Sequence, residues 1–119
     1  MNLQKIKEIL RADVIVGSSL KKEIEMVCAC DLMSELLSCV LRRSETLLLT
    51  NLTHPQTVHT AEIVEIPAIC FVRGRKPGSQ TIELAKENNI ILLSTYFSLY
   101  EASGQLYKDG ILGCSEYRR

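Results

Sequence analysis

The sequence predicts an α/β fold: a layered, mostly parallel sheet of about five strands joined by crossover helices. Three apolar runs carry this prediction, at 47–50 (LLLT), 68–72 (AICFV) and 90–94 (IILLS). They do not alternate between apolar and polar residues, which is typical of strands buried on both faces. Helix-start residues follow each run directly. Strands that alternate with helices in this way pair in parallel.

The first thirty residues add one helix and two strands to this pattern. Residues 2–11 have the spacing of an amphipathic helix. Its apolar face would consist of Leu3, Ile6, Ile9 and Leu10. Strands are expected at 13–17 and 26–30, with a polar connection over 18–24. Together with the three apolar runs, these segments make five strands.

Boundary residues place the next helices. Asp31 precedes an apolar stripe over 32–42 and is expected to be its N-cap. That stripe consists of Leu32, Met33, Leu36, Leu37, Val40 and Leu41. Pro55 suits the first turn of the following helix, and Pro67 prevents that helix from continuing into the next strand.

Two helices are expected in the last third of the chain. One spans 80–88, and Ser94 or Thr95 is expected to cap the other. The core candidates of the last helix are Phe97, Tyr100 and Leu106. The tail after Gly110 is expected to be loosely held.

Bulk properties predict a single domain over residues 1–119, with 46% hydrophobic and 24% charged residues. The formal net charge is zero, which argues against a general attraction to nucleic acid or to an anionic membrane. No apolar run approaches the roughly 20 residues of a membrane span. Charges interrupt the first residues too often for a signal peptide. We therefore expect a cytoplasmic protein.

The five cysteines are an odd number, and three of them lie in apolar segments. Cys28, Cys30 and Cys70 are therefore expected to be reduced and buried. Cys28 and Cys30 would place both sulfurs on one face of a strand. Packing is the favoured interpretation of this pair, with a redox or cluster-related role as the alternative. Because further ligands at metal spacing are missing, no metal or cofactor is expected.

Ligands of an open parallel sheet bind beyond the carboxyl ends of its strands. The ligand-binding residues predicted at that edge are Asn51, Thr53, His54, Arg73, Gly74, Arg75, Lys76 and Thr95. The three cations of the 73–76 loop could hold a phosphate or a carboxylate. A solvated surface loop is the alternative interpretation. His54 could donate to an anion or be no more than a neighbour of the helix cap.

No catalytic residues are predicted. The hydroxyls of Thr50, Thr53, Ser94 and Thr95 are explained by capping, and no base is fixed beside them by sequence. His54 and His59 are five residues apart, so they do not share a helix face as zinc ligands at i, i+4 would.

Four blocks, at 30–40, 49–63, 71–90 and 92–111, resemble the DRTGG domain family. The last block, with its GQLYKDG ending, is the most specific. The resemblance implies a layered α/β fold like the N-terminal domain of HPr kinase/phosphorylase. At the positions of the name-giving motifs this chain carries Asn51-Leu52-Thr53 and Val72-Arg73-Gly74. Kinase chemistry is excluded, because it belongs to the other domain of HPr kinase and this chain has no P-loop.

The resemblance also implies a function. DRTGG domains occur as regulatory inserts of some pyrophosphatases and phosphotransacetylases, where they respond to adenine nucleotides or dimerise. Free-standing members often lie near genes of iron-only hydrogenases. We therefore expect a non-enzymatic regulatory module that binds an anion, with an adenine nucleotide as the candidate, or a protein partner, as a homodimer. The alternatives are an accessory factor linked to hydrogenase or signalling gene clusters, and a small enzyme acting on a phosphorylated metabolite. Tyr96, Tyr100 and Tyr107 would form either a partner surface or part of the core.

Overall fold

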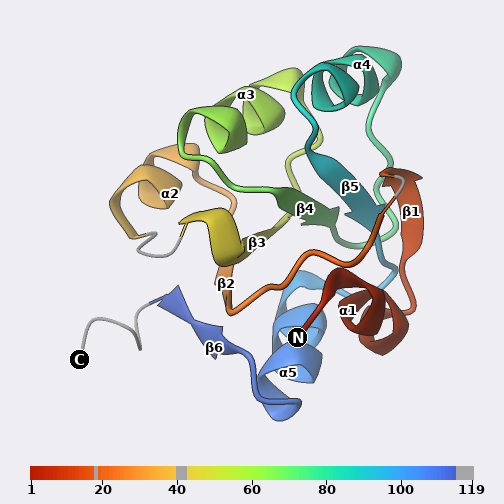
Figure 1. Ribbon diagram of the computed structural model, residues 1–119, viewed down its shortest axis with the longest axis vertical. Coiled ribbons are helices and arrows are strands. Elements are labelled where there is room, and N and C mark those ends of the chain that lie inside the picture. The colour runs from red at the N-terminus through yellow and green to blue at the C-terminus, as the bar shows by residue number, and fades with distance from the viewer. Residues whose placement is uncertain (18, 40–42, 115–119) are drawn as a thin grey trace.

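The computed structural model describes residues 1–17, 19–39 and 43–114, with only the backbone at 37–39 and 43 (Figure 1). Helices alternate with strands along most of the chain. In chain order, the elements are α1 (Leu3–Leu10), β1 (Asp13–Val16), β2 (Met26–Ala29), α2 (Met33–Cys39), a 3₁₀ turn (Arg43–Glu45), β3 (Thr46–Thr50), α3 (Pro55–Ile63), β4 (Ala68–Phe71), α4 (Ser79–Glu87), β5 (Ile91–Ser94), α5 (Leu99–Lys108) and β6 (Leu112–Gly113).

These strands form one six-stranded sheet in the order β1-β5-β4-β3-β2-β6. The pairs β2–β3, β3–β4, β4–β5 and β2–β6 are parallel, and β1 runs antiparallel to β5 at one edge. The predicted fold class, a mostly parallel α/β sheet with crossover helices, is confirmed. It has six strands instead of about five.

Helices cover both faces of the sheet (Figure 1). The core under α1 and α5 contains Leu47 and Leu49 of β3, whereas the core under α2, α3 and α4 contains the intervening Leu48. All three leucines are fully buried. A strand buried on both faces gains from an apolar residue at every position, so the uninterrupted apolar runs give this layered structure.

The predicted amphipathic face of α1 is confirmed, since Leu3, Ile6 and Leu10 are fully buried. Two predicted core residues are exposed instead: Leu32 is 59% exposed and Tyr100 is 87% exposed. Leu32 lies before α2 begins, and Tyr100 lies on the outer face of α5. The side chains of Leu37, Val40 and Leu41 lie outside the described residues.

Two predicted helix caps are wrong. Asp31 does not cap α2, because its carboxylate accepts hydrogen bonds from the end of β3. Neither Ser94 nor Thr95 caps α5. Ser98 is that cap, and it forms a reciprocal capping box with Glu101, in which the Ser98 hydroxyl accepts from the Glu101 N–H at 3.1 Å.

Residues 111–114, the described part of the tail after Gly110, are more ordered than predicted, and the rest of the predicted tail lies outside the described residues. Ile111 is buried, and Leu112 and Gly113 pair in parallel with Met26 and Val27 of β2. This pairing makes β6 the edge strand beside β2. None of the helices in the described ranges is both long and apolar enough to cross a membrane.

Candidate functional site

The carboxyl ends of β2, β3, β4 and β5 meet at one edge of the sheet. Their register fixes which residues become neighbours there: Thr50 of β3 pairs with Phe71 of β4, and Phe71 pairs with Ser94 of β5. The segments that leave these three positions begin at Asn51, Val72 and Thr95. The predicted site segments, 51–54, 73–76 and 95, therefore start side by side.

Asp31 and Asn51 lock the ends of β2 and β3 together. The Oδ1 of Asp31 accepts from the Asn51 backbone N–H at 2.7 Å and from the Thr50 hydroxyl at 3.0 Å. Its Oδ2 accepts from the Asn51 side-chain amide at 2.9 Å. The Oδ1 of Asn51 is buried and has no hydrogen-bond partner among the described residues. Asn51 is thus held by one half of its amide while the other half still lacks a donor.

These bonds set the ionisation of Asp31. Burial alone would raise the pKa of its carboxyl group, but the hydrogen bonds from Asn51 and Thr50 lower it, and so does the positive charge of Arg75. The balance places the pKa of Asp31 below its usual value. Asp31 therefore remains charged at neutral pH, and its charge interacts favourably with that of Arg75.

The loop after β4 is built from two consecutive residues in the left-handed region, Arg73 at φ +60° and Gly74 at φ +68°. All three N–H groups from Arg73 to Arg75 are used inside the protein: they donate to the carbonyls of Phe97, Thr95 and Val72 at 2.8, 2.8 and 3.2 Å. The Ser94 hydroxyl donates to the Arg75 carbonyl at 2.9 Å. An anion at this loop would therefore be held by side chains, because these backbone amides are already paired.

Gly74 is packed against an aromatic side chain. A Cβ at this position would lie 2.8 Å from two ring carbons of Tyr96. The missing side chain therefore makes room for the Tyr96 ring against the loop backbone. The sequence prediction that Gly74 allows a ligand to approach closely remains untested, and the structure shows an aromatic ring at that position.

The three cations of the loop differ in their surroundings. Arg73 and Arg75 are exposed. Lys76 is exposed as well, but its Nζ lies 3.2 Å from the Oδ2 of Asp13. Surface pairs of this kind contribute little stability. Nevertheless, the pair neutralises Lys76 locally, and the two arginines are left as the stronger anion-binding groups.

The other predicted site residues divide into exposed and structural ones. His54 is the exposed N-cap residue of α3, and its side chain makes no capping bond. Thr53 is half-buried and accepts a hydrogen bond at its carbonyl from the Thr81 hydroxyl. Thr95 is 1% exposed, and its hydroxyl donates to the Leu10 carbonyl at 2.6 Å. That hydroxyl therefore fastens α1 to the sheet and faces no open surface.

A hollow of about 230 Å³ adjoins this edge. It lies between the end of α1 and the segment after β5, and it is lined by Leu10, Arg11, Thr95, Tyr96 and Phe97. Sequence reasoning did not include Arg11 or Phe97 in the site. The Thr95–Leu10 hydrogen bond, across 85 residues of sequence, and the packing of α1 against α5 bring α1 to this edge, and such contacts leave no local signal.

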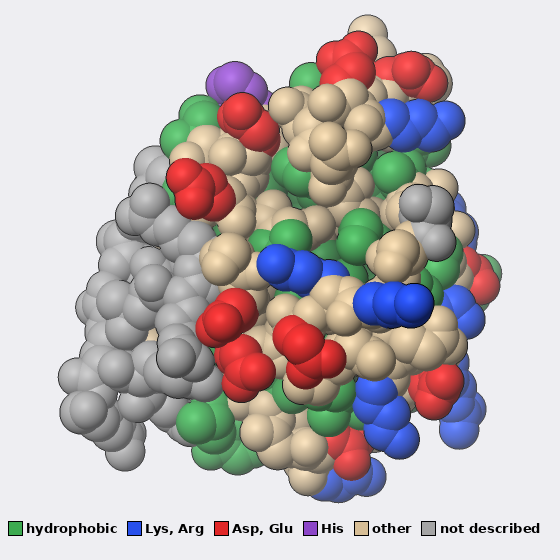
Figure 2. Space-filling model, viewed as in Figure 1, with side chains coloured by type: hydrophobic (Ala, Val, Ile, Leu, Met, Phe, Trp, Pro, Cys, Tyr) green, Lys and Arg blue, Asp and Glu red, His purple; other side chains and the backbone are tan. Residues whose placement is uncertain are grey.

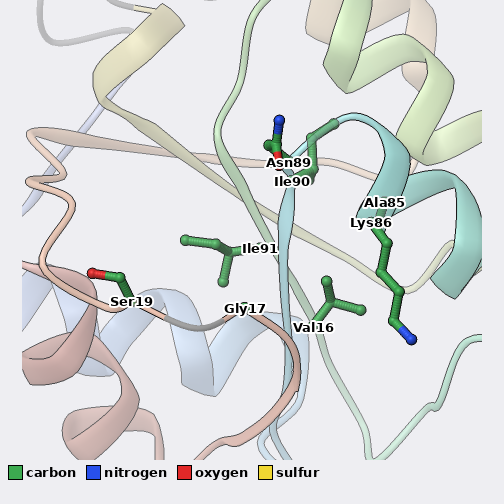
Figure 3. Close-up of a pocket in the computed structure, with 8 residues that line it drawn as sticks. All are labelled: Val16, Gly17, Ser19, Ala85, Lys86, Asn89, Ile90 and Ile91. Atoms are coloured by element: carbon green, nitrogen blue, oxygen red, sulfur yellow. The ribbon is translucent and has the colours of Figure 1, made fainter.

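A second hollow, of about 340 Å³, lies at the amino end of β5, away from the carboxyl ends of the parallel strands. It lies between the end of β1 and the C-terminal end of α4 (Figure 3). Its lining is mostly apolar, and Lys86 is its charged member. Elsewhere, acidic and basic side chains share the face shown in Figure 2, and neither sign covers it. Among the described residues, no group of three or more His, Cys, Asp or Glu side chains is placed to hold a metal ion.

Comparison with known proteins supports the fold. No family model matches the chain, and no curated protein sequence matches it. A crystal structure of the CBS and DRTGG domains from the regulatory region of Clostridium perfringens pyrophosphatase, in complex with its activator diadenosine tetraphosphate, has a similar fold. The TM-score is 0.65 at 18% sequence identity, and the match covers 87% of this chain and 44% of that chain. At this identity the likeness establishes a shared fold.

Proposed function

We propose that this chain is a non-enzymatic regulatory module that binds a phosphorylated ligand, an adenine nucleotide by preference, at the carboxyl edge of its sheet. The observation that carries the proposal is the gathering of cations there. Arg73 and Arg75 leave the end of β4, and Arg11 reaches the adjoining hollow from α1. Guanidinium groups bind phosphate through paired, charge-assisted hydrogen bonds.

The same edge offers a place for a base. The hollow beside Tyr96 and Phe97 has two aromatic side chains and Arg11 in its lining, and rings and guanidinium planes both stack on nucleobases. The amide oxygen of Asn51 lies at the same edge but is buried, so it could accept from an exocyclic amine only after the groups that cover it move. The nucleotide ligand of the Clostridium perfringens regulatory region, a protein of the same fold, supports this ligand class.

We further propose that the module acts as a homodimer through the outer face of α5. Tyr100 is 87% exposed and Tyr107 is 58% exposed. The two tyrosines border a shallow groove that includes Gly104. Exposed tyrosines that lie in one stripe are typical of protein interfaces. A two-fold axis through this stripe would pair it with itself.

A second candidate function is favoured by the same tyrosines. If a different protein covers the α5 face, the chain is an accessory factor that binds a partner. The small-enzyme alternative has less support, because the hydroxyls of Thr50 and Thr95 already donate to Asp31 and to the Leu10 carbonyl. We place the module in the cytoplasm, as the sequence predicts.

A thermal-shift screen against adenine nucleotides and dinucleoside polyphosphates tests ligand binding. A ligand at one hundred times its Kd stabilises its protein by about 2.7 kcal/mol, which for a chain of this size raises Tm on the order of 10 °C. A flat response across the panel would remove the nucleotide from the proposal and favour the accessory factor.

A pair of matched variants tests the location. Arg73→Ala/Arg75→Ala should weaken binding more than tenfold, since each charge-assisted bond contributes about 1.5–3 kcal/mol. Lys21→Ala/Lys22→Ala removes the same charge from the connection that follows β1. Because β1 runs antiparallel to β5, this connection starts at the amino ends of the parallel strands, away from the proposed site. That variant should bind as the wild type does. Equal losses in the two variants would show that only net charge matters.

A further inference from the structure

Cys28 and Cys30 form a close thiol pair at the end of β2. Their sulfur atoms lie 4.0 Å apart, and the Cys28 thiol donates to the Cys30 sulfur. Side chains two residues apart on a strand point to the same face, which brings the sulfurs together. The Cys30 N–H donates to the Leu49 carbonyl at 3.1 Å, so the backbone is still held against β3 at this point.

The two thiols are differently placed for reaction. Cys28 is 2% exposed, whereas Cys30 is half-buried and reachable from solvent. The hydrogen bond from Cys28 lowers the pKa of Cys30 to about 7, although burial, Asp31 and Glu35 act in the opposite direction. The lowered pKa raises the thiolate fraction of Cys30 near neutral pH, and the thiolate is the reactive form. Cys70 is the internal contrast, because complete burial raises the pKa of its thiol to about 12.

A bond between the two sulfurs requires the backbone to bend at the end of β2. On an ideal strand, residues two apart lie about 6.6 Å from each other, and so do their Cβ atoms, whereas the Cβ atoms of a disulfide are about 3.5–4.5 Å apart. Rotation of the two side chains alone therefore does not close the bridge. Cys30 follows Ala29, the last residue of β2, so the bend falls where the strand ends. The resulting disulfide would be strained and easily reduced.

We propose that Cys28 and Cys30 are a reversible dithiol–disulfide pair, which a low-molecular-weight disulfide oxidises. The Cys30 thiolate attacks one sulfur of the oxidant, whose S–S bond breaks and releases one thiolate. The Cys28 thiol then gives up its proton and attacks the Cys30 sulfur, and this releases the second thiolate. The two leaving thiolates take up protons. In sum, two protein thiols lose two electrons and two protons, and the oxidant becomes two thiols.

Oxidised glutathione, followed by alkylation and tandem mass spectrometry, tests this assignment on the full chain. We expect a bridge between Cys28 and Cys30, no lasting glutathione adduct, and complete reversal by dithiothreitol. Cys28→Ser should trap glutathione on Cys30. Cys30→Ser should form neither the bridge nor a glutathione adduct on Cys28. Cys70→Ser is the matched control and should form the bridge as the wild type does. Circular dichroism would verify that each variant is folded.

Alkylation kinetics give a readout that does not need the bridge. Iodoacetamide should modify Cys30 with a pH midpoint near 7 and on the order of a hundredfold faster than Cys70. The proposal would be overturned by a bridge from Cys30 to Cys39 or Cys114, or by a lasting adduct on Cys30 in the wild type. It would also be overturned if Cys30 reacted no faster than Cys70.

Discussion

At the scale of single residues, Asp31 decides how the candidate site is organised. Its carboxylate holds Asn51 through two hydrogen bonds, and its charge interacts favourably with that of Arg75. This arrangement uses an acid to position the groups that would meet an anion. Asn51 is the group most constrained by it, since its amide nitrogen is occupied and its oxygen remains unpaired.

The lowered pKa of Asp31 predicts a specific dependence of stability on pH. A carboxyl group whose pKa is lower in the folded state stabilises the fold above its unfolded pKa of about 3.9, and this stabilisation is lost as pH falls through the folded pKa. Asp31→Asn should cost about 1 kcal/mol at pH 7, a value reduced by solvent screening at this exposed side chain. The cost should shrink as pH falls through the folded-state pKa of Asp31.

Urea denaturation at a series of pH values from 7 to 2 measures this difference. Asp109→Asn, at the C-terminal end of α5, is the control for loss of one acidic side chain. If Asp31→Asn costs as much at pH 2 as at pH 7, the stability that Asp31 provides does not depend on its charge.

The two glycines Gly74 and Gly104 predict opposite responses to alanine. Gly74 has φ +68°, and a Cβ there would meet the Tyr96 ring at 2.8 Å. Gly74→Ala should therefore destabilise the protein by about 1–2 kcal/mol, even if the exposed ring moves aside. Nothing lies within 4 Å of a Cβ at Gly104, inside α5. Gly104→Ala should stabilise it by up to about 1 kcal/mol. Thermal unfolding of both variants measures the signs, and equal signs would contradict this account.

At the scale of elements, the start of α5 shows which local sequence patterns predict a helix boundary. The residues Ser98 and Glu101 have the S-x-x-E spacing of a capping box, and the structure forms it. The prediction instead chose Ser94 or Thr95, because both also follow an apolar run. What distinguishes them is tertiary: the Ser94 and Thr95 hydroxyls donate to the carbonyls of Arg75 and Leu10, 19 and 85 residues away.

The capping box predicts a loss of stability that a second serine of α5 does not share. Ser98→Ala removes the acceptor for the Glu101 N–H and should cost about 1 kcal/mol. Ser103→Ala removes a hydroxyl that donates to the Leu99 carbonyl inside the helix. Because alanine favours helix, its effect should be near zero. Urea denaturation measures the free energy of unfolding of both variants. Similar losses in the two would show that the capping box adds no stability of its own.

The same contrast holds for strands. The apolar runs at 47–50 and 68–72 contain β3 and β4 in full apart from Thr46. Burial on both faces favours an apolar residue at every position of these strands, so the sequence shows where they lie. The two-residue strand β6 has no such signal. It exists because Leu112 and Gly113 meet Met26 and Val27, about 86 positions earlier in the chain. Local reasoning therefore recovers the other strands and misses β6.

At the scale of the whole molecule, topology explains how much of the site the sequence could predict. Parallel strands end at one edge, so placing Asn51 and Arg73 together needed only the strand assignments. The internal pairing of the 73–75 amides, the burial of Thr95 and the approach of Arg11 all depend on contacts between distant segments. Those contacts decide which of the gathered groups face a ligand.

The proposed homodimer predicts the mass of the protein in solution. Light scattering at tens of micromolar should report twice the 13.4 kDa mass of the chain. Tyr100→Ala should raise the Kd of the dimer at least tenfold, because tyrosines at the centre of an interface are frequent hot spots. Ile63→Ala, on α3 and 56% exposed, is the control on another surface. A single monomer mass at all concentrations would rule out the dimer.

An anionic nucleotide is proposed to bind where the parallel strands end. Titration of the ¹⁵N-labelled chain with diadenosine tetraphosphate, followed by two-dimensional amide spectra, locates the binding site residue by residue. Chemical-shift changes should be concentrated at Asp31, Asn51, the 73–76 loop and the 95–97 segment, with the Asn51 side-chain amide among them. Changes confined to the outer face of α5 or to the hollow beside β1, or no changes at millimolar ligand, would contradict this proposal.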